Sequence, residues 1–147
     1  MKLRSKARTF VISAVAIGGT VVGMSGASAA GPYFTIFSYN NGKCLTPYGG
    51  SSSNGANIVQ WDCSNSGTQL WWQDSQGRIV NKNGKCMTTY GGSKNDGANI
   101  VQWDCNSSSV HVNGFGAMVT AANKCIRPYG GSKNNGANQT QWECSAP

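Results

Sequence analysis

Short apolar runs, separated by small and polar residues, recur along the chain after residue 31. Examples are Tyr33 to Tyr39, Ile58 to Trp61 and Ile79 to Val80, which sit between clusters of glycine, asparagine and serine. Runs of this length between turn-forming residues are typical of β-strands. Pairs such as Asn54-Gly55 and Asp96-Gly97 suit the positive φ angles of hairpin turns. No segment after residue 31 shows a sustained apolar rhythm at helical spacing, so the pattern predicts an all-β fold.

The first 30 residues follow a different pattern. Alternating basic residues precede an apolar run from Phe10 to about Gly26, and the small residues Ala27 to Ala30 follow. This is the layout of a secretory signal peptide. An uncleaved membrane anchor is the alternative, but the run contains four glycines and falls short of the roughly 20 apolar residues that span a bilayer. We therefore expect a signal peptide at 1–30, a single domain at 31–147, secretion, and no membrane attachment after cleavage.

Removal of this leader changes the charge of the protein. The full chain has 12 Lys and Arg residues against five Asp and Glu, a net charge of +7. Four of the basic residues lie in the leader, so eight remain against five acidic ones and the net charge becomes +3. No basic cluster is left on any one segment, and nucleic acid is not an expected partner.

Three copies of one unit follow the leader. The first half of the unit, Asn-Gly-Lys-Cys followed by a Tyr-Gly-Gly turn, begins at Asn41, recurs at Asn83 and returns in shortened form at Asn123. The second half, Gly-Ala-Asn ending in Gln-Trp-x-Cys, also occurs three times, and its cysteines are Cys63, Cys105 and Cys144. Units of about 40 residues are too small to bury their own apolar faces and must share a core. A closed three-fold arrangement removes most exposed sheet edges, whereas a linear solenoid needs polar caps that the sequence does not show.

The cysteine spacing predicts one disulfide within each unit. The two cysteines of each unit are 19 positions apart, which favours the pairs Cys44–Cys63, Cys86–Cys105 and Cys125–Cys144. Each bridge closes a loop of about 20 residues, and such a loop stabilises a small exported domain by about 3 kcal/mol through the unfolded state. Metal binding is the alternative use of cysteine, but CxxC pairs and a second histidine are missing. We expect neither a metal nor another cofactor.

These units resemble the ricin-B-type β-trefoil lectins and carbohydrate-binding modules of secreted bacterial hydrolases. The resemblance rests on Cys-Leu near the start of a unit, Trp-x-Cys after a Gly-Ala stretch, and the Gln-x-Trp element at Gln69 to Trp71. It covers essentially the whole chain after the leader. It implies a β-trefoil of three disulfide-stapled repeats, the last one truncated, in which Trp71 plugs the barrel.

The resemblance also implies which residues bind sugar. A pyranose needs a flat aromatic face and nearby hydrogen-bonding groups. The expected carbohydrate-binding residues are three tryptophans, three tyrosines beside the Gly-Gly turns, and the residue two positions after the first cysteine of each unit: Trp61, Trp103, Trp142, Tyr48, Tyr90, Tyr129, Thr46, Thr88 and Arg127. Packing of the tryptophans against the neighbouring disulfides is an open alternative, because strand alternation does not say which face is solvated.

Two departures from the family pattern bear on binding. The family commonly has an aspartate where this chain has Thr46, Thr88 and Arg127, so galactose recognition in the usual manner is not expected. Counting from the cysteines, Gln69 and Trp71 correspond to His111 and Asn113 in the second unit, and the third unit ends before this element. An incomplete last hairpin predicts an opened core or an unpaired edge, which favours self-association or docking on a partner.

A catalytic site is poorly supported by the sequence. Asp62, Asp104 and Glu143 repeat one position, which we assign to a turn or backbone hydrogen bond, and only two other carboxylates follow the leader. Glycoside hydrolysis requires a pair of carboxylates across the bond, and His111 is the only histidine. We therefore expect a secreted carbohydrate-binding protein that recognises polysaccharide or cell-surface glycan. The alternative is a non-catalytic β-trefoil interaction scaffold, such as a protease-inhibitor-like protein with degenerate sugar sites.

Overall fold

The computed structural model describes residues 32–144, so the predicted signal peptide lies outside the described residues. Within this range the chain forms ten short strands and four single 3₁₀ turns, and no α-helix. The strands are β1 Cys44–Pro47, β2 Ile58–Trp61, β3 Trp71–Gln73, β4 Ile79–Asn81, β5 Cys86–Thr89, β6 Ile100–Trp103, β7 His111–Val112, β8 Met118–Val119, β9 Cys125–Pro128 and β10 Gln139–Trp142. The turns are Tyr48–Gly50, Gly67–Gln69, Tyr90–Gly92 and Tyr129–Gly131. The all-β prediction is confirmed.

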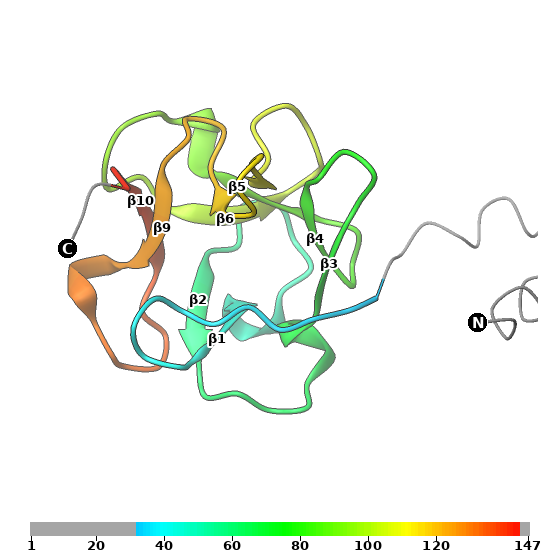
Figure 1. Cartoon of the computed structure of the whole chain (residues 1–147). Helices are drawn as coiled ribbons and strands as arrows, with labels where there is room; N and C mark the ends of the chain where they lie inside the picture. The colour runs from blue at the N-terminus through cyan, green and yellow to red at the C-terminus, as the bar shows by residue number, and fades with distance from the viewer. Residues whose placement is uncertain (1–31, 145–147) are drawn as a thin grey trace, which may run out of the picture. The chain divides into compact units, whose positions relative to one another are not determined.

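Each repeat contributes one hairpin of the same register. Strands β1–β2, β5–β6 and β9–β10 pair antiparallel, and in each the first cysteine of the unit lies opposite the tryptophan. The disulfides join Cys44 to Cys63, Cys86 to Cys105 and Cys125 to Cys144, with Cα–Cα distances of 5.0, 4.8 and 4.9 Å. The predicted pairing is confirmed. Figure 1 shows the three hairpins arranged around the middle of the domain.

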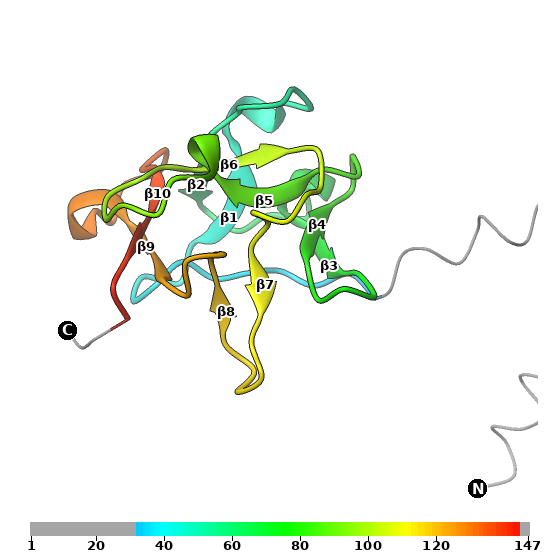
Figure 2. The same cartoon turned by 90° about the horizontal axis from the view of Figure 1, so that it is seen from above.

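Two further hairpins connect one repeat to the next. Strand β3 pairs with β4, and β7 pairs with β8, which Figure 2 shows as a projecting hairpin. The segment before β1 takes part as well, because Phe34 and Trp71 exchange backbone hydrogen bonds of 2.8 and 2.9 Å. Residues 34–38 thereby run beside β3 on one side and reach β1 through the bond from the Leu45 N–H to the Ile36 carbonyl.

The three repeats close into a ring. The Gly55 N–H donates to the Gln102 carbonyl, the Gly97 N–H to the Gln141 carbonyl and the Gly136 N–H to the Gln60 carbonyl, each at 2.8 Å. Every repeat therefore supplies one donor to the next and the third supplies the first. Because this pairing closes on itself, the edges of β2, β6 and β10 are covered, as the closed arrangement predicts and a linear solenoid does not.

The core lies inside this ring and is continuous through the first two repeats. It consists of one cluster of buried apolar side chains: Leu45, Ile58, Trp71, Ile79, Met87, Ile100 and Val110. Trp71 is fully buried, and its indole N–H donates to the Leu45 carbonyl at 3.0 Å. The indole thus fills the core without leaving a polar atom unpaired, which is the plug role that the family resemblance implies.

The counterpart of Trp71 in the second repeat differs from the sequence prediction. The Asn113 carboxamide oxygen accepts the N–H groups of Phe115 and Ala117, just as the Asp74 carboxylate accepts those of Gln76 and Arg78. Asn113 therefore matches the turn residue Asp74, three positions after Trp71, and not Trp71 itself. Fully buried Val110 occupies the plug position. The count from the cysteines is wrong because the loop after Cys105 is shorter than the loop after Cys63.

Burial is weaker in the third repeat. All residues of β1 and β5 are buried, whereas three of the four residues of β9 are only partly buried. Within residues 32–144 the third repeat has no strand that corresponds to β3 or β7. Ile126 of β9 packs against the core from a half-buried position. Strand β9 is thus less covered than β1 and β5, and the opened core and the self-association stay predictions.

Candidate functional site

Each of the three repeat tryptophans is fixed along one edge and open along the rest. Trp61, Trp103 and Trp142 keep 44, 40 and 40% of their surface exposed, at the ends of β2, β6 and β10. The buried edge rests on a glycine of another repeat: Trp61 against Gly136, Trp103 against Gly55 and Trp142 against Gly97. These contacts fix the ring orientation, and the exposed part of each ring remains available to a ligand.

A cavity lies beside each tryptophan. The volumes are about 240 Å³ at Trp61, about 380 Å³ at Trp103 and about 680 Å³ at Trp142. Each is lined by the tryptophan, the Gly-Gly turn of the same repeat and the residue two positions after the first cysteine. The sequence-predicted elements Trp61 and Thr46, Trp103 and Thr88, and Trp142 and Arg127 are therefore brought together in pairs.

The Gly-Gly turn explains why the pocket walls are open. Gly49 and Gly50 have φ angles of +63° and +68°, in the left-handed region that glycine adopts without strain. The same turn occurs in the other two repeats. The preceding tyrosines point outward with exposures of 60, 62 and 65% for Tyr48, Tyr90 and Tyr129. Only Tyr90 lines its pocket, so the structure places Tyr48 and Tyr129 outside the cavities of their repeats.

Thr46 and Thr88 are buried, and their hydroxyl groups already donate hydrogen bonds to backbone carbonyls. The Thr46 Oγ1 donates to the Thr68 carbonyl at 3.1 Å, and the Thr88 Oγ1 donates to the Ser108 carbonyl at 2.7 Å. A threonine hydroxyl has one proton and two lone pairs. These side chains can therefore meet a ligand as acceptors, and they fix the loop that forms the opposite wall of each pocket.

Arg127 lies in a different environment. Its guanidinium carbon is 4.9 Å from the centre of the Tyr39 ring, an attractive cation–π arrangement. Its Nε is buried without a hydrogen-bond acceptor among the residues that the structure describes. The Trp142 pocket also contains Lys133, Asp96 and Glu143. It is thus the charged pocket, whereas uncharged residues line the cavities at Trp61 and Trp103.

The indole N–H groups also differ between the pockets. The Trp142 Nε1 donates to the Thr140 Oγ1 at 3.0 Å. Val59 and Val101 occupy the position of Thr140 in the other repeats, and a valine side chain cannot accept a hydrogen bond. The indole N–H groups of Trp61 and Trp103 can therefore donate a hydrogen bond to a ligand hydroxyl, in addition to the aromatic face that each ring presents.

Comparison with known proteins identifies the family. Residues 20–103 match the family model described as ricin-type β-trefoil lectin domain-like, which is more than half of the chain. The chain belongs to this family. No curated protein matches it.

Solved structures agree with a ricin-type β-trefoil. The designed three-fold symmetric protein ThreeFoil is 26% identical, with a TM-score of 0.70 over 78% of this chain and 91% of that chain. An exo-β-1,3-galactanase from Clostridium thermocellum is 27% identical, with a TM-score of 0.66 over 80% of this chain and 28% of that chain. The C-terminal half of the earthworm R-type lectin, solved with GalNAc, is 21% identical and resembles this chain in fold, with a TM-score of 0.67 over 80% and 92%.

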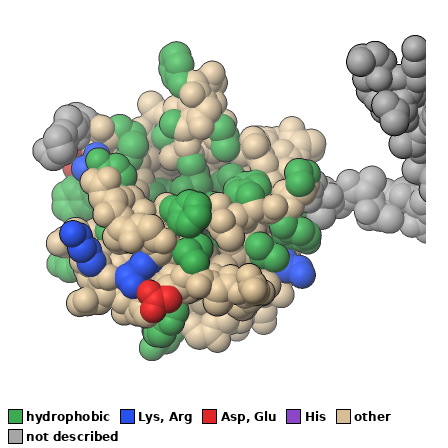
Figure 3. Space-filling view, turned by 60° about the horizontal axis from the view of Figure 1, so that its bottom comes forward, with side chains coloured by type: hydrophobic (Ala, Val, Ile, Leu, Met, Phe, Trp, Pro, Cys, Tyr) green, Lys and Arg blue, Asp and Glu red, His purple; other side chains and the backbone are tan. Residues whose placement is uncertain are grey.

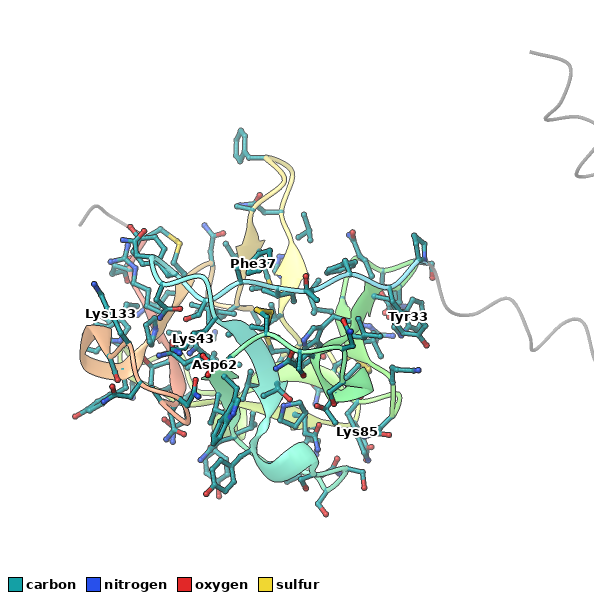
Figure 4. All side chains as sticks on the ribbon, turned by 90° about the horizontal axis from the view of Figure 1, so that it is seen from below. Tyr33, Phe37, Lys43, Asp62, Lys85 and Lys133 are labelled. Atoms are coloured by element: carbon teal, nitrogen blue, oxygen red, sulfur yellow. A yellow bond between two sulfur atoms is a disulfide. The ribbon has the colours of Figure 1, made fainter. Side chains whose placement is uncertain are left out.

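In this ricin-type domain two of the three acids beside the tryptophans, Asp62 and Asp104, connect repeats. Asp62 accepts from the Lys43 ammonium at 2.6 Å and from the Asn135 amide of another repeat at 3.0 Å. Figure 4 shows Lys43 and Asp62 close together. The hydrogen bond from Lys43 lowers the pKa of Asp62, and Asn135 adds to the effect. Asp104 makes the same contacts with Lys85 and Asn54. The backbone or turn role expected for these acids is wrong, because their oxygens bind side chains.

Sequence reasoning missed the buried glutamines that precede the tryptophans. Gln60, Gln102 and Gln141 are fully buried in this ricin-type domain. The Gln102 Nε2 donates to the carbonyls of Ser51 and Ser53 in the first repeat, both at 2.8 Å. Gln60 and Gln141 hold the corresponding loops of the third and second repeats in the same way. The available signal was the occurrence of glutamine before tryptophan in all three units.

Residues 32–144 of the domain offer no site of two other types. No three His, Cys, Asp or Glu side chains gather in a group that could hold a metal ion. No helix in the described range has the length and apolar character to cross a membrane. Figure 3 shows hydrophobic side chains distributed among uncharged polar ones on one face, with few charged groups between them.

Proposed function

We propose that this ricin-type domain is a secreted, non-catalytic lectin that binds polysaccharide or cell-surface glycan through its three tryptophan pockets. One observation carries the proposal: each repeat sets a half-exposed tryptophan, locked in place by a glycine of another repeat, over a cavity of about 240 to 680 Å³. Pyranose binding needs an aromatic face and convergent polar groups, and each pocket offers both. Family membership supports carbohydrate binding in general.

Relatives and neighbours point to the same ligand class. The earthworm lectin was solved with GalNAc, and a bitter gourd homologue of type II ribosome-inactivating proteins was solved with α-methyl-D-galactoside. In this chain threonine or arginine stands at the position of the family aspartate, so we propose a sugar other than galactose bound in the usual manner. Secretion is supported by the three disulfides, which persist in oxidising compartments.

A non-catalytic role is supported by the state of the carboxylates. Asp62, Asp104 and Asp74 are each paired with a lysine or arginine at 2.6 to 2.7 Å. Asp96 and Glu143 share the ammonium of Lys124. A glycosidase needs one carboxyl group that is protonated and one that is free to attack or to activate water. The pKa values of Asp62, Asp74 and Asp104 are lowered, which favours their ionised form and disfavours a role as general acid.

The experiment is a binding screen with residues 31–147 against soluble glycans and insoluble polysaccharides. Binding of at least one polysaccharide, without release of reducing sugar on long incubation, supports a lectin. Release of sugar makes the protein an enzyme, and failure to bind any glycan rejects the proposed function.

The interaction-scaffold alternative rests on a separate surface. Phe34, Phe37 and Tyr39 are exposed aromatic residues on the segment that precedes β1, where Phe34 pairs with Trp71 of β3 and Phe37 with Cys44 of β1. Exposed aromatic side chains grouped on one segment are a feature of interaction surfaces. Light scattering of the native chain and of Phe37→Ser separates the scaffold from the lectin by their oligomeric state. A native dimer that becomes a monomer in Phe37→Ser supports the interaction scaffold. A monomer in both cases removes the main support for it.

A further inference from the structure

The Trp142 pocket differs from the other two in charge and in size. Arg127 and Lys133 line it, whereas uncharged side chains line the pockets at Trp61 and Trp103. Its volume of about 680 Å³ exceeds the about 380 and about 240 Å³ of the others. The side chains that differ in charge lie on a hairpin and beside a Gly-Gly turn that all three repeats share.

The two acidic residues of this pocket share one lysine, which balances one of their two negative charges. Lys124 binds the Asp96 carboxylate at 2.6 Å and the Glu143 carboxylate at 3.2 Å. The hydrogen bond to Asp96 raises the pKa of Lys124, which keeps the ammonium charged. Neither Arg127 nor Lys133 forms an ion pair with any carboxylate of residues 32–144. The pocket therefore has two cations that are open to an anionic ligand.

Arg127 is held in a fixed position without a hydrogen-bond acceptor. It stands on β9 opposite Thr140, and its guanidinium lies over the Tyr39 ring at 4.9 Å. The buried Nε has no acceptor among the described residues. A guanidinium stacked on an aromatic ring keeps its in-plane N–H groups available, and because the Nε is buried, the terminal Nη groups are the ones that can meet the two oxygens of a carboxylate in the pocket.

Lys133 is placed by a contact from another repeat. The Gln60 Nε2 donates to the carbonyls of Ser132 and Asn134, on either side of Lys133, at 2.8 Å each. Figure 4 shows Lys133 at the edge of the domain, beside the ribbon of the third repeat. Its backbone is therefore anchored while its ammonium reaches solvent at the pocket rim.

We propose that the Trp142 pocket is selective for an acidic sugar, whose carboxylate is bound by Arg127 and Lys133 while its ring lies against Trp142. This inference rests on the proposed function, that the tryptophan pockets bind carbohydrate, and it names the ligand class of one of them. The pockets at Trp61 and Trp103 take neutral sugars. The Arg127 fork can pair with two oxygens of a carboxylate or of a phosphate, so the test includes a phosphate probe to separate the two.

The test is a titration of residues 31–147 with three probes: an oligogalacturonate, its fully methyl-esterified form, and a mannose 6-phosphate oligosaccharide. Arg127→Gln removes the fork and its charge, and Arg127→Lys keeps the charge alone. Lys94→Gln is the matched control, because Lys94 occupies the position of Lys133 in the second repeat but does not line that repeat's pocket. It changes the net charge by the same amount as Arg127→Gln.

We expect the native chain to bind the acid more tightly than the ester. Arg127→Gln should lower affinity for the acid about tenfold or more and leave affinity for the ester unchanged, with Arg127→Lys in between. Lys94→Gln should match the native chain, and unchanged ester binding shows that the variants are folded. Equal binding of acid by the native chain and Arg127→Gln, or an equal loss in Lys94→Gln, overturns the inference while the proposed function stands. Tighter binding of the phosphate probe overturns the carboxylate assignment. Binding of none of the three probes overturns this inference, whereas the proposed function is decided by the broader glycan screen.

Discussion

The Trp103 ring meets Gly55 so closely that a Cβ added to this glycine lies 3.3 Å from the ring carbon Cζ3. Gly55 belongs to the first repeat and Trp103 to the second, so one contact serves both closure of the ring of repeats and orientation of a proposed binding residue. The requirement for glycine has two causes, because Gly55 also has a φ angle of +88°.

Gly55→Ala tests this double requirement. A left-handed conformation costs a residue with a Cβ about 1–2 kcal/mol, and the contact with Trp103 adds to that. Gly116→Ala is the matched control, because its φ angle is +81° and nothing lies within 4 Å of the added Cβ. We expect urea unfolding to show a larger loss for Gly55→Ala, together with altered tryptophan fluorescence. Equal losses would contradict a packing role for the Gly55 contact.

The buried glutamines give a second prediction, in which two equivalent residues behave differently. The Gln102 side chain donates to two carbonyls and accepts from the Asn81 amide at 2.7 Å. Gln141 donates to two carbonyls, but its Oε1 has no partner in the described residues. Each buried polar group left unpaired costs about 1–3 kcal/mol. Gln102→Met should therefore lower the free energy of unfolding more than Gln141→Met does.

Thermal or urea unfolding of both variants measures this difference. The reverse order, or equal effects, would show that the unpaired Oε1 of Gln141 does not reduce the contribution of that glutamine.

Acid should destabilise the domain through Asp62 and Asp104. Their hydrogen bonds to Lys43 and Lys85 lower the pKa of both carboxyl groups. A group whose pKa is lower in the folded state stabilises the fold above its unfolded pKa, about 3.9 for aspartate, and the contribution is lost as the pH falls through the folded value. The free energy of unfolding should therefore decrease below about pH 4.

The Asp62→Asn/Asp104→Asn double variant provides the comparison. Its loss of stability in acid should be smaller than that of the native chain. Part of the loss should remain, because Asp74 is unchanged. Burial acts to raise the pKa of Asp74, but its hydrogen bonds from Arg78 and Gln76 outweigh burial and lower it. If the free energy of unfolding falls as steeply below about pH 4 in the double variant as in the native chain, the ion-pair explanation is wrong.

Binding should be weak for a single sugar and stronger for a polymer. Two of the three pockets lack a charged acceptor, because Thr46 and Thr88 stand where the family commonly has aspartate. Three pockets on one rigid body raise the apparent affinity for a ligand that reaches more than one of them. Titration with a monosaccharide and with oligomers of increasing length measures the effect, and equal affinity per molecule along that series excludes multivalency.

The sequence predicted the framework well because its signals are local. The repeat of Cys44 and Cys63 at a constant spacing fixed the disulfides, and the Asn-Gly and Gly-Gly pairs marked the turns. The contacts that position the site were not predictable in this way. The ring of Trp103 rests on Gly55 and the amide of Gln102 binds Ser51, so both depend on which repeats become neighbours when the ring closes.

One wrong alignment and two missed hydrogen bonds have a similar origin. The match of Trp71 with Asn113 failed because counting along the chain does not detect a shorter loop, whereas the buried position of Val110 reveals it. The hydrogen bonds from the hydroxyls of Thr46 and Thr88 to the carbonyls of Thr68 and Ser108 were not predicted. These carbonyls lie about twenty residues away in sequence, on the loop across the pocket.

The most direct test of the account is the affinity of Trp61→Ala and Trp103→Ala for a neutral polysaccharide found in the binding screen, measured by isothermal titration. Phe115→Ala is the matched control, because Phe115 is a 97% exposed aromatic residue that lines none of the three pockets. Circular dichroism checks that every variant is folded. The account predicts lower affinity for both tryptophan variants, by about tenfold where stacking contributes 1–3 kcal/mol as for aromatic side chains on nucleobases, and native affinity for Phe115→Ala. Native affinity in both folded tryptophan variants would contradict the account and favour the interaction scaffold.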